Sequence, residues 1–245
     1  MKIIFLGTGS AIPTKTRNCQ SVAIEQNGNY YIFDCGAPLT EVLTQNDIPL
    51  EKVKAVFLSH IHRDHVTGLL TFLCLRAYSP DKHTLTLYTP SESWANALIS
   101  LVKETAHDKV FNPTVVPIII ENEGLIFDDG MVRVIATLTC HQKAQSRPTY
   151  AYKIESKDKR VFITGDLLPD ASDFPQEAIV STSDAVITEL HHFGPSTLFP
   201  LLKDCPTKNL LIIHIDECNR ELFEQATNEF TKNATCPKDG DIYVL

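Results

Sequence analysis

Three histidines and an aspartate stand within six positions of this chain, as His60, His62, Asp64 and His65. The cluster follows an apolar run of strand type and precedes a stretch with helical spacing, so it falls in a strand-to-helix loop, where side chains can converge. Imidazole nitrogens and carboxylate oxygens suit Zn²⁺, Fe²⁺ or Mn²⁺. Alternation along an extended loop turns His60 and His62 the same way. The cluster therefore predicts a metal site, with Asp64 and His65 free to turn towards a second ion.

The length and composition predict one large domain. A chain of 245 residues, 43% of them hydrophobic, can bury a continuous core, and no linker or repeat divides it, so we expect a single domain over residues 1–245. The net charge of −8 and the lack of basic runs argue against a long nucleic acid as partner. No stretch resembles a membrane span or a signal peptide. Seven cysteines without a C-x-x-C pair argue against disulfides and a structural zinc site, and they favour the cytoplasm.

Apolar runs rich in β-branched residues predict strands, and longer runs with helical spacing predict helices. The predicted strands cover residues 2–6, 21–25, 30–34, 54–58, 84–88, 132–138, 150–154, 161–164, 185–188 and 209–213. The predicted helices cover residues 39–45, 66–78, 91–105, 195–203 and 217–232. Strands thus come in two batches, each followed by helices. Two facing mixed sheets with helices outside satisfy this order, although the order alone leaves several α/β folds open.

The opening segment 5–13 and the Arg17-Asn18 pair, together with the histidine cluster, resemble the metallo-β-lactamase superfamily and, within it, the ribonuclease Z branch. The resemblance implies the fold of that superfamily, an αββα four-layer sandwich of two mixed sheets flanked by helices. It also implies that a lone downstream histidine, an aspartate after Thr-Gly and a late histidine complete the site. His141, Asp166 and His214 match these positions in order.

The resemblance divides the metal ligands between two divalent ions. It implies that one ion is held by His60, His62 and His141, that the other is held by Asp64, His65 and His214, and that Asp166 bridges them. Zinc is favoured, and manganese or iron are alternatives.

Three other features near the predicted site have lesser expected roles. Asp34 ends a strand in a segment typical of the superfamily, and metal-bound histidines commonly donate their second N–H to such a carboxylate. The loop at 7–10 lacks the spacing of a phosphate-binding loop, so we expect tight backbone packing there. Cys140, beside His141, is interpreted as a small apolar residue rather than a ligand.

Two metal ions lower the pKa of a shared water, so that a bridging hydroxide can attack carbon or phosphorus near neutral pH. The resemblance favours a phosphodiesterase, in which a histidine protonates the leaving oxygen. In ribonuclease Z that histidine begins a His-Glu-Ala-Thr motif, whereas here Thr188 stands at its position and Glu189 persists. We therefore expect His191 or His192 to donate the proton, and we count Asp64 and Glu189 among the catalytic residues. Alternation from Glu189 favours His191, because the carboxylate would raise the pKa of that imidazole.

The expected substrate is a small or cyclic phosphodiester. The stretch between His141 and Asp166 is too short for the long arm by which ribonuclease Z grips transfer RNA, and the acidic net charge points the same way. Two alternatives stay open, a lactone or carboxylic-ester hydrolase with the same metals and a non-catalytic metal-binding sensor. The oligomeric state is undecided by the sequence, and a homodimer is one alternative.

Overall fold

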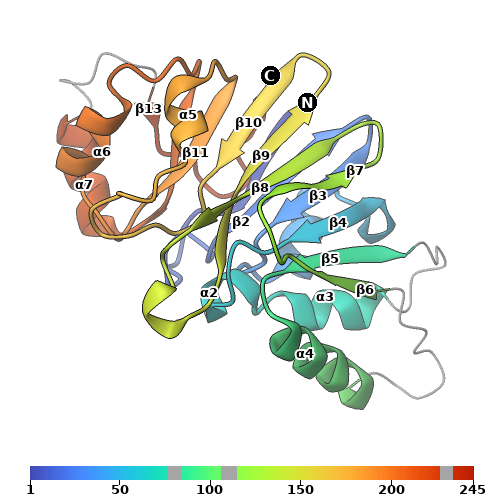
Figure 1. Ribbon diagram of the computed structural model, residues 1–245. Helices are drawn as coiled ribbons and strands as arrows, with labels where there is room; N and C mark the ends of the chain where they lie inside the picture. Colours follow the sequence, from blue (N-terminus) through green and yellow to red (C-terminus); the bar gives the residue numbers. More distant parts are fainter. Residues whose placement is uncertain (77–83, 106–114, 227–233) are drawn as a thin grey trace.

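A computed structural model of the protein describes residues 1–76, 84–105, 115–226 and 234–245 (Figure 1). Its strands form two seven-stranded sheets. In order across the first sheet lie β14 (Ile242–Val244), β1 (Lys2–Gly7), β2 (Ser21–Gln26), β3 (Asn29–Phe33), β4 (Val53–Phe57), β5 (Leu85–Thr89) and β6 (Val115–Ile119). In order across the second lie β13 (Ala234–Thr235), β12 (Leu210–Ile215), β11 (Ala185–Leu190), β10 (Lys159–Ile163), β9 (Thr149–Ser156), β8 (Arg133–Thr139) and β7 (Gly124–Asp128).

The two sheets pack face to face, with helices on both outer faces. Inward side chains of both sheets form one apolar core, in which Phe33 and Tyr152 lie 5.5 Å apart between ring centroids. The first sheet is covered by α1 (Leu39–Gln45), α3 (Leu69–Arg76) and α4 (Glu92–Thr105). The second is covered by α5 (Gln176–Val180), α6 (Pro195–Leu202) and α7 (Glu217–Ala226). Figure 1 shows α3 and α4 on one side of the molecule and α6 and α7 on the other, which confirms the predicted four-layer sandwich.

Strand direction gathers several loops at one end of the sandwich. Strands β10, β11 and β12 pair in parallel, so their carboxyl ends all lie at the same end of the sandwich. Strand β8 is antiparallel to β9, and β9 is antiparallel to β10, so the carboxyl end of β8 lies at that end of the sandwich too. The loop after β4 joins them, because the backbone N–H of Tyr150 donates to the carbonyl of Ser59 at 2.9 Å. Loops from both sheets therefore meet at this end of the sandwich.

The predicted helix at 66–78 is wrong at its start. The chain forms α2 (Arg63–Val66) first and then begins α3 at Leu69, because the Gly68 N–H donates to the carbonyl of Cys35 at 2.8 Å instead of continuing one helix. Residues 77–78 of that prediction, and 227–232 of the last predicted helix, lie outside the described residues. Among the described residues, no helix combines the length and apolarity that crossing a bilayer requires.

Several short elements were not predicted. They are β6, β7, β13, β14, α5 and the 3₁₀ turns at Leu50–Lys52 and Lys143–Gln145. Strand β6 lies at a sheet edge, is partly exposed along its length and contains Pro117, which weakens a strand signal. Strand β14 is three residues long and depends on pairing with β1 at the other end of the sequence. Local pattern carries little information about such elements.

Gly36 packs against the backbone of the metal-binding loop. A Cβ atom there would overlap the carbonyl oxygen of Asp64. The main chain cannot yield easily, because Cys35 N–H donates to the His65 carbonyl at 2.7 Å and Gly36 N–H to the Gln20 carbonyl at 2.9 Å. We therefore expect Gly36→Ala to lower the free energy of unfolding by about 1–3 kcal/mol or more, measured by urea denaturation.

Gly194→Ala is the matched control for this change. The nearest atom to a Cβ at Gly194 is Ser196 Oγ at 4.0 Å, so the same added methyl meets open space. Its effect should stay near or below about 1 kcal/mol, the usual scale of an N-cap change, because Gly194 is the N-cap residue of α6. Wild-type stability in the Gly36→Ala protein would contradict the close packing.

Candidate metal centre

The predicted metal-binding side chains all reach the same end of the sandwich. Each comes from the end of a strand or the segment directly after it. His60 and His62 follow β4, Asp64 and His65 lie in α2, His141 follows β8, Asp166 follows β10, and His214 lies within β12. Their ligand atoms form groups in which all atoms lie within 4.8 Å of one another. The structure therefore brings together every residue of the predicted set.

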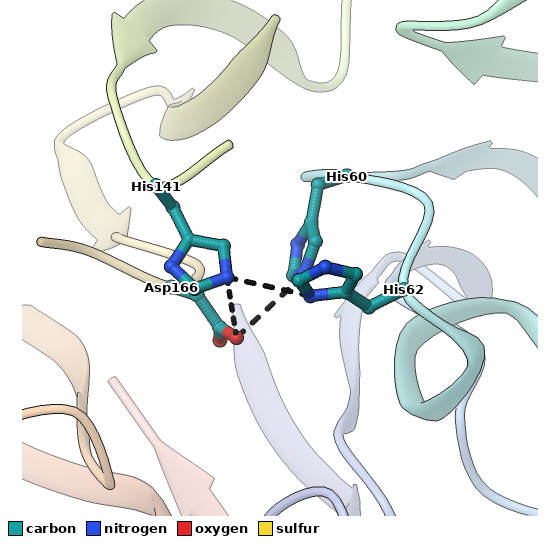
Figure 2. A group of neighbouring side chains, drawn as sticks. All are labelled: His60, His62, His141 and Asp166. Atoms are coloured by element: carbon teal, nitrogen blue, oxygen red, sulfur yellow. Dashed lines mark hydrogen bonds and ion pairs between the residues drawn. The ribbon is translucent and has the colours of Figure 1, made fainter. Parts of the chain in front are cut away.

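The first group contains His60, His62, His141 and Asp166 (Figure 2). Nδ1 of His62 lies 2.9 Å from Nε2 of His60 and 3.3 Å from Nε2 of His141. The Oδ2 atom of Asp166 completes the group, at 3.6 Å from Nε2 of His60 and 3.8 Å from Nε2 of His141. Figure 2 shows the three rings and the carboxylate pointing towards one another, with His60 and His62 on one loop and His141 and Asp166 on two other segments. Three imidazoles and a carboxylate are a donor set that suits zinc.

The second group contains Asp64, His65 and His214. Oδ2 of Asp64 lies 3.5 Å from Nε2 of His65 and 3.2 Å from Nε2 of His214. The other oxygen of Asp166, Oδ1, lies 3.4 Å from Nε2 of His65 and 3.6 Å from Nδ1 of His214. One carboxylate oxygen of Asp166 thus faces each group, as a bridging carboxylate does.

The backbone before Asp166 allows this central position. Gly165 has φ of 62°, in the left-handed region that favours glycine. A Cβ atom on it would lie 2.7 Å from Cβ of Ser59, so only glycine lets the loop after β10 approach the loop after β4 so closely. His214 also has a positive φ, 46°, where the register of β11 and β12 shifts. Such strain in a non-glycine residue is typical of functional sites.

Several buried polar atoms in this cluster have no hydrogen-bond partner. Among the described residues these include Nε2 of His65, Oδ1 of Asp166 and Nδ1 of His214, which all face the second group. Buried polar atoms are rarely left unpaired, because each costs about 1–3 kcal/mol. A divalent cation accepts electron pairs from nitrogen and carboxylate oxygen alike, so it satisfies all three. The cluster is a divalent metal site.

A second layer of hydrogen bonds orients these side chains. Oδ2 of Asp34 lies 2.8 Å from Nδ1 of His65, the contact expected from the sequence. Asp34 also accepts from the Oγ–H and N–H of Ser59 and from Nε2–H of Gln20. Ser59 Oγ lies 3.0 Å from Nδ1 of His60. Sequence analysis missed Ser59 and Gln20, although the position of Ser59 directly before the histidine cluster was a usable signal.

The expectation that Glu189 partners His191 is wrong. Strand β11 continues to Leu190, so Glu189 is buried within the strand. Its Oε2 atom accepts the backbone N–H groups of His191 and His192 at 3.1 and 2.9 Å, and the chain turns instead of staying extended. The turn brings Nδ1 of His192 to 2.8 Å from Oε2 of Glu189 and 4.0 Å from Oδ2 of Asp166. His192, not His191, is therefore the histidine beside the carboxylates of Glu189 and Asp166.

His191 instead pairs with Asp216, which sequence analysis missed. Nδ1 of His191 lies 2.8 Å from Oδ2 of Asp216, and the Oγ–H of Ser10 donates to Oδ1 of Asp216 at 2.5 Å. Both histidine side chains lie at the rim of the site, 28% exposed for His191 and 23% for His192. Asp216 stands two positions after His214, and only the fold brings Ser10 and His191 to it.

Electrostatics make the metal-free cluster attract positive charge. Burial lowers the pKa of His214, but the charge of Asp166, the hydrogen bond to Asp64 and the nearby carboxylate of Glu189 outweigh it and raise that pKa to about 9. Burial also lowers the pKa of His65, but the carboxylates of Asp166 and Asp34 outweigh burial and raise that pKa well above its usual value. The pKa of His60 is lowered, chiefly by burial and then by His65. Protons thus occupy part of the cluster when no metal is bound.

Solved structures and curated relatives define the class. The short form of human tRNase Z has a TM-score of 0.78 at 22% identity, covering 100% of this chain and 99% of that one. The metallo-β-lactamase fold protein YhfI from Bacillus subtilis has a TM-score of 0.76 at 18% identity, covering 99% and 98%. A ribonuclease Z from Methanococcus aeolicus is 36% identical over 159 residues, covering 65% of this chain and 48% of that protein. The chain thus has the metallo-β-lactamase fold and is similar in sequence to ribonuclease Z over about two thirds of its length.

The family can be stated more narrowly. The model of the protein family described as "Anti-Pycsar protein Apyc1" matches residues 1–198, so the chain belongs to that family. It spans about half the length of the curated ribonuclease Z relatives that it matches.

Metal binding should release protons near neutral pH, because a histidine must be neutral to bind a metal. At about pH 7.5 the metal-free protein holds a proton on His214, whose pKa of about 9 lies above its ordinary value of 6.5. That proton stabilises the metal-free fold fully below pH 6.5, and its contribution is lost as pH rises through about 9. Calorimetric titration with Zn²⁺ in buffers of different ionisation enthalpy should show proton release that diminishes towards pH 9. Heats that do not depend on the buffer at about pH 7.5 would contradict this assignment.

Proposed function

We propose that the protein is a metal-dependent phosphodiesterase that hydrolyses a small or cyclic phosphodiester. The observation that carries the proposal is the position of Asp166, with Oδ1 3.4 Å from Nε2 of His65 and Oδ2 3.6 Å from Nε2 of His60. A carboxylate between two ligand groups suits two ions side by side, an arrangement common in enzymes that hydrolyse phosphate esters. Relatives named ribonuclease Z support phosphate esters over lactones and carboxylic esters.

Two zinc ions fit the donors best, and manganese or iron could use the same set. One ion would take His60, His62 and His141, the other Asp64, His65 and His214, and Asp166 would contact both. When bound, the ions lower the pKa of a water molecule and stabilise negative charge on the reacting phosphate. Hydrogen bonds such as that from His65 to Asp34 hold the donors in place before any ion arrives.

We assign the proton donor to His192. Burial lowers the pKa of this imidazole, but its hydrogen bond to Glu189 and the charge of that carboxylate outweigh burial, so the pKa is raised. Glu189 is itself fixed, because its Oε1 atom accepts the N–H of Leu167 at 2.7 Å. With Nδ1 on Glu189, Nε2 of His192 is left to deliver a proton to the leaving oxygen. Glu189 therefore acts by positioning His192.

A small substrate is supported by what lies between His141 and Asp166. That stretch contains a 3₁₀ turn at Lys143–Gln145 and the hairpin of β9 and β10, which belongs to the second sheet. No separate arm projects from this part of the chain, all of which is described. The net charge of −8 also disfavours a long polyanion, whereas a small diester can rely on the local charge of the metals.

The proposed activity predicts metal-dependent hydrolysis of bis(p-nitrophenyl) phosphate. Protein reconstituted with Zn²⁺ or Mn²⁺ should contain about two ions per chain and release p-nitrophenol, and chelation should abolish the release. Asp64→Ala combined with His65→Ala should leave about one ion, because the group of His60, His62 and His141 remains. A panel with lactones serves as the comparison. Lactone rates far above the diester rate, or two ions retained by the double variant, would overturn the proposal.

The assignment of His192 predicts a dependence on the leaving group. His192→Ala should lower kcat by about 10²–10⁴-fold for a diester with an alkyl leaving group, because such a group needs a proton to depart. The loss should be much smaller with p-nitrophenolate, which departs without one. Metal content should not change in this variant. Equal losses for both leaving groups would show that His192 is not the acid.

A further inference from the structure

A cavity of about 600 Å³ lies beside the metal centre and takes no part in holding metal. Its wall includes the loop after β1, Arg63 from α2, and the end of β12. The loop is held there because the backbone of Gly9 forms isolated β-bridges with both Cys19 and Ile215. His191 lines this cavity, whereas His192 does not. The two neighbouring histidines therefore face different surroundings.

The polar side of the cavity is an ordered chain of three residues. Ser10 Oγ–H donates to one oxygen of Asp216 at 2.5 Å, and Nδ1 of His191 lies 2.8 Å from the other. That nitrogen is buried and lies beside the Asp216 carboxylate without an aligned hydrogen bond, whereas 28% of the His191 side chain remains exposed. The opposite edge of the ring, which carries Nε2, is thus the part left to the cavity. The Asp216 carboxylate beside Nδ1 favours the ring orientation that leaves Nε2 free for a ligand.

The remaining walls suit an organic group attached to an anion. Ile12 is 73% exposed and lines the cavity together with Ile215, which supplies apolar surface. Arg63 is fixed at the rim by donation from Nη2 to the carbonyl of Ala11 at 2.7 Å. Arg17 also lines the cavity, and its guanidinium is anchored through Nη1 to the carbonyl of Pro237 at 2.8 Å. Arg17 is buried and held in the wall, so the guanidinium of Arg63 at the rim is the group that attracts a negatively charged diester to this side.

We propose that this cavity binds the ester group that stays on phosphorus during hydrolysis, and that His191, positioned by Asp216 and Ser10, contacts that group through Nε2. The inference rests on the proposed function, in which His192 protonates the leaving oxygen. With the leaving group on the His192 side, the other ester substituent points towards the cavity, which of these two histidines only His191 lines. The preferred substrate is therefore a diester whose retained group is large enough to fill this space.

The test compares two diesters with the same leaving group and different retained groups, bis(p-nitrophenyl) phosphate and methyl p-nitrophenyl phosphate. His191→Ala should raise KM about 3- to 10-fold for the first, as loss of one hydrogen bond and its packing does, and change KM for the second by less than twofold. Asp216→Asn should act in the same direction with a smaller effect, because His191 loses its orienting carboxylate. Metal content and unfolding temperature are measured for each variant.

Two conservative substitutions separate substrate contact from a structural role. Asparagine at position 191 can place its amide nitrogen where Nδ1 faces Asp216 but has nothing at Nε2, whereas glutamine can reach the position of Nε2. We therefore expect His191→Asn to behave like His191→Ala, and His191→Gln to recover most of the wild-type KM.

The outcomes distinguish this inference from the function on which it rests. An unchanged KM in His191→Ala, equal changes for both diesters, or wild-type behaviour of His191→Asn would overturn the role of His191 while leaving the phosphodiesterase intact. Failure of the wild-type protein to hydrolyse either diester would overturn both.

Discussion

Asp166 is 2% exposed, and its carboxylate is surrounded by imidazole rings. The arrangement of the whole site depends on stabilising the negative charge of this buried carboxylate. A buried charge is expensive unless an opposite charge compensates it. The positive charge of His214 and His65 performs this function in the metal-free protein and keeps the pKa of Asp166 low against the effect of burial. Divalent ions can replace those protons on the same atoms. The site is thus built so that cations and protons compete for one set of donors.

The sandwich holds these donors through backbone conformations that ordinary strands avoid. Asp34, Gly165 and His214 have φ values of 57°, 62° and 46°, and all three lie at or near strand ends beside the metal site. Two of these segments are closely restrained, because Gly165 packs against Ser59 and Asp34 accepts hydrogen bonds from Ser59 and Gln20. Strain of this kind persists because the surrounding structure over-determines it. Rigid packing therefore supplies the preorganisation that a hydrolytic metal site needs.

Two histidine–carboxylate pairs flank the site and differ in their surroundings. His192 rests on Glu189, which is 1% exposed and lies 3.9 Å from His214 through Oε2, so this pair belongs to the metal centre. His191 rests on Asp216, whose side chain is 34% exposed and faces a solvent-accessible cavity. Neighbouring residues in the sequence thus reach separate environments. In the proposed function, this separation assigns the two histidines of one short segment different roles, proton donation for His192 and substrate contact for His191.

The sequence by itself determined the four-layer fold and the histidines and aspartates that gather in one cluster, because a dense histidine cluster after a strand and the strand-then-helix order are local patterns. It also indicated Asp34. The pairing of His192 with Glu189 required the structure, since the carboxylate accepts two backbone N–H groups and turns a chain that simple alternation treats as extended. Asp216 with Ser10 could not be found either, because residues 206 positions apart are joined only by tertiary contact. Local spacing determines which groups are available, whereas long-range packing decides which of them meet.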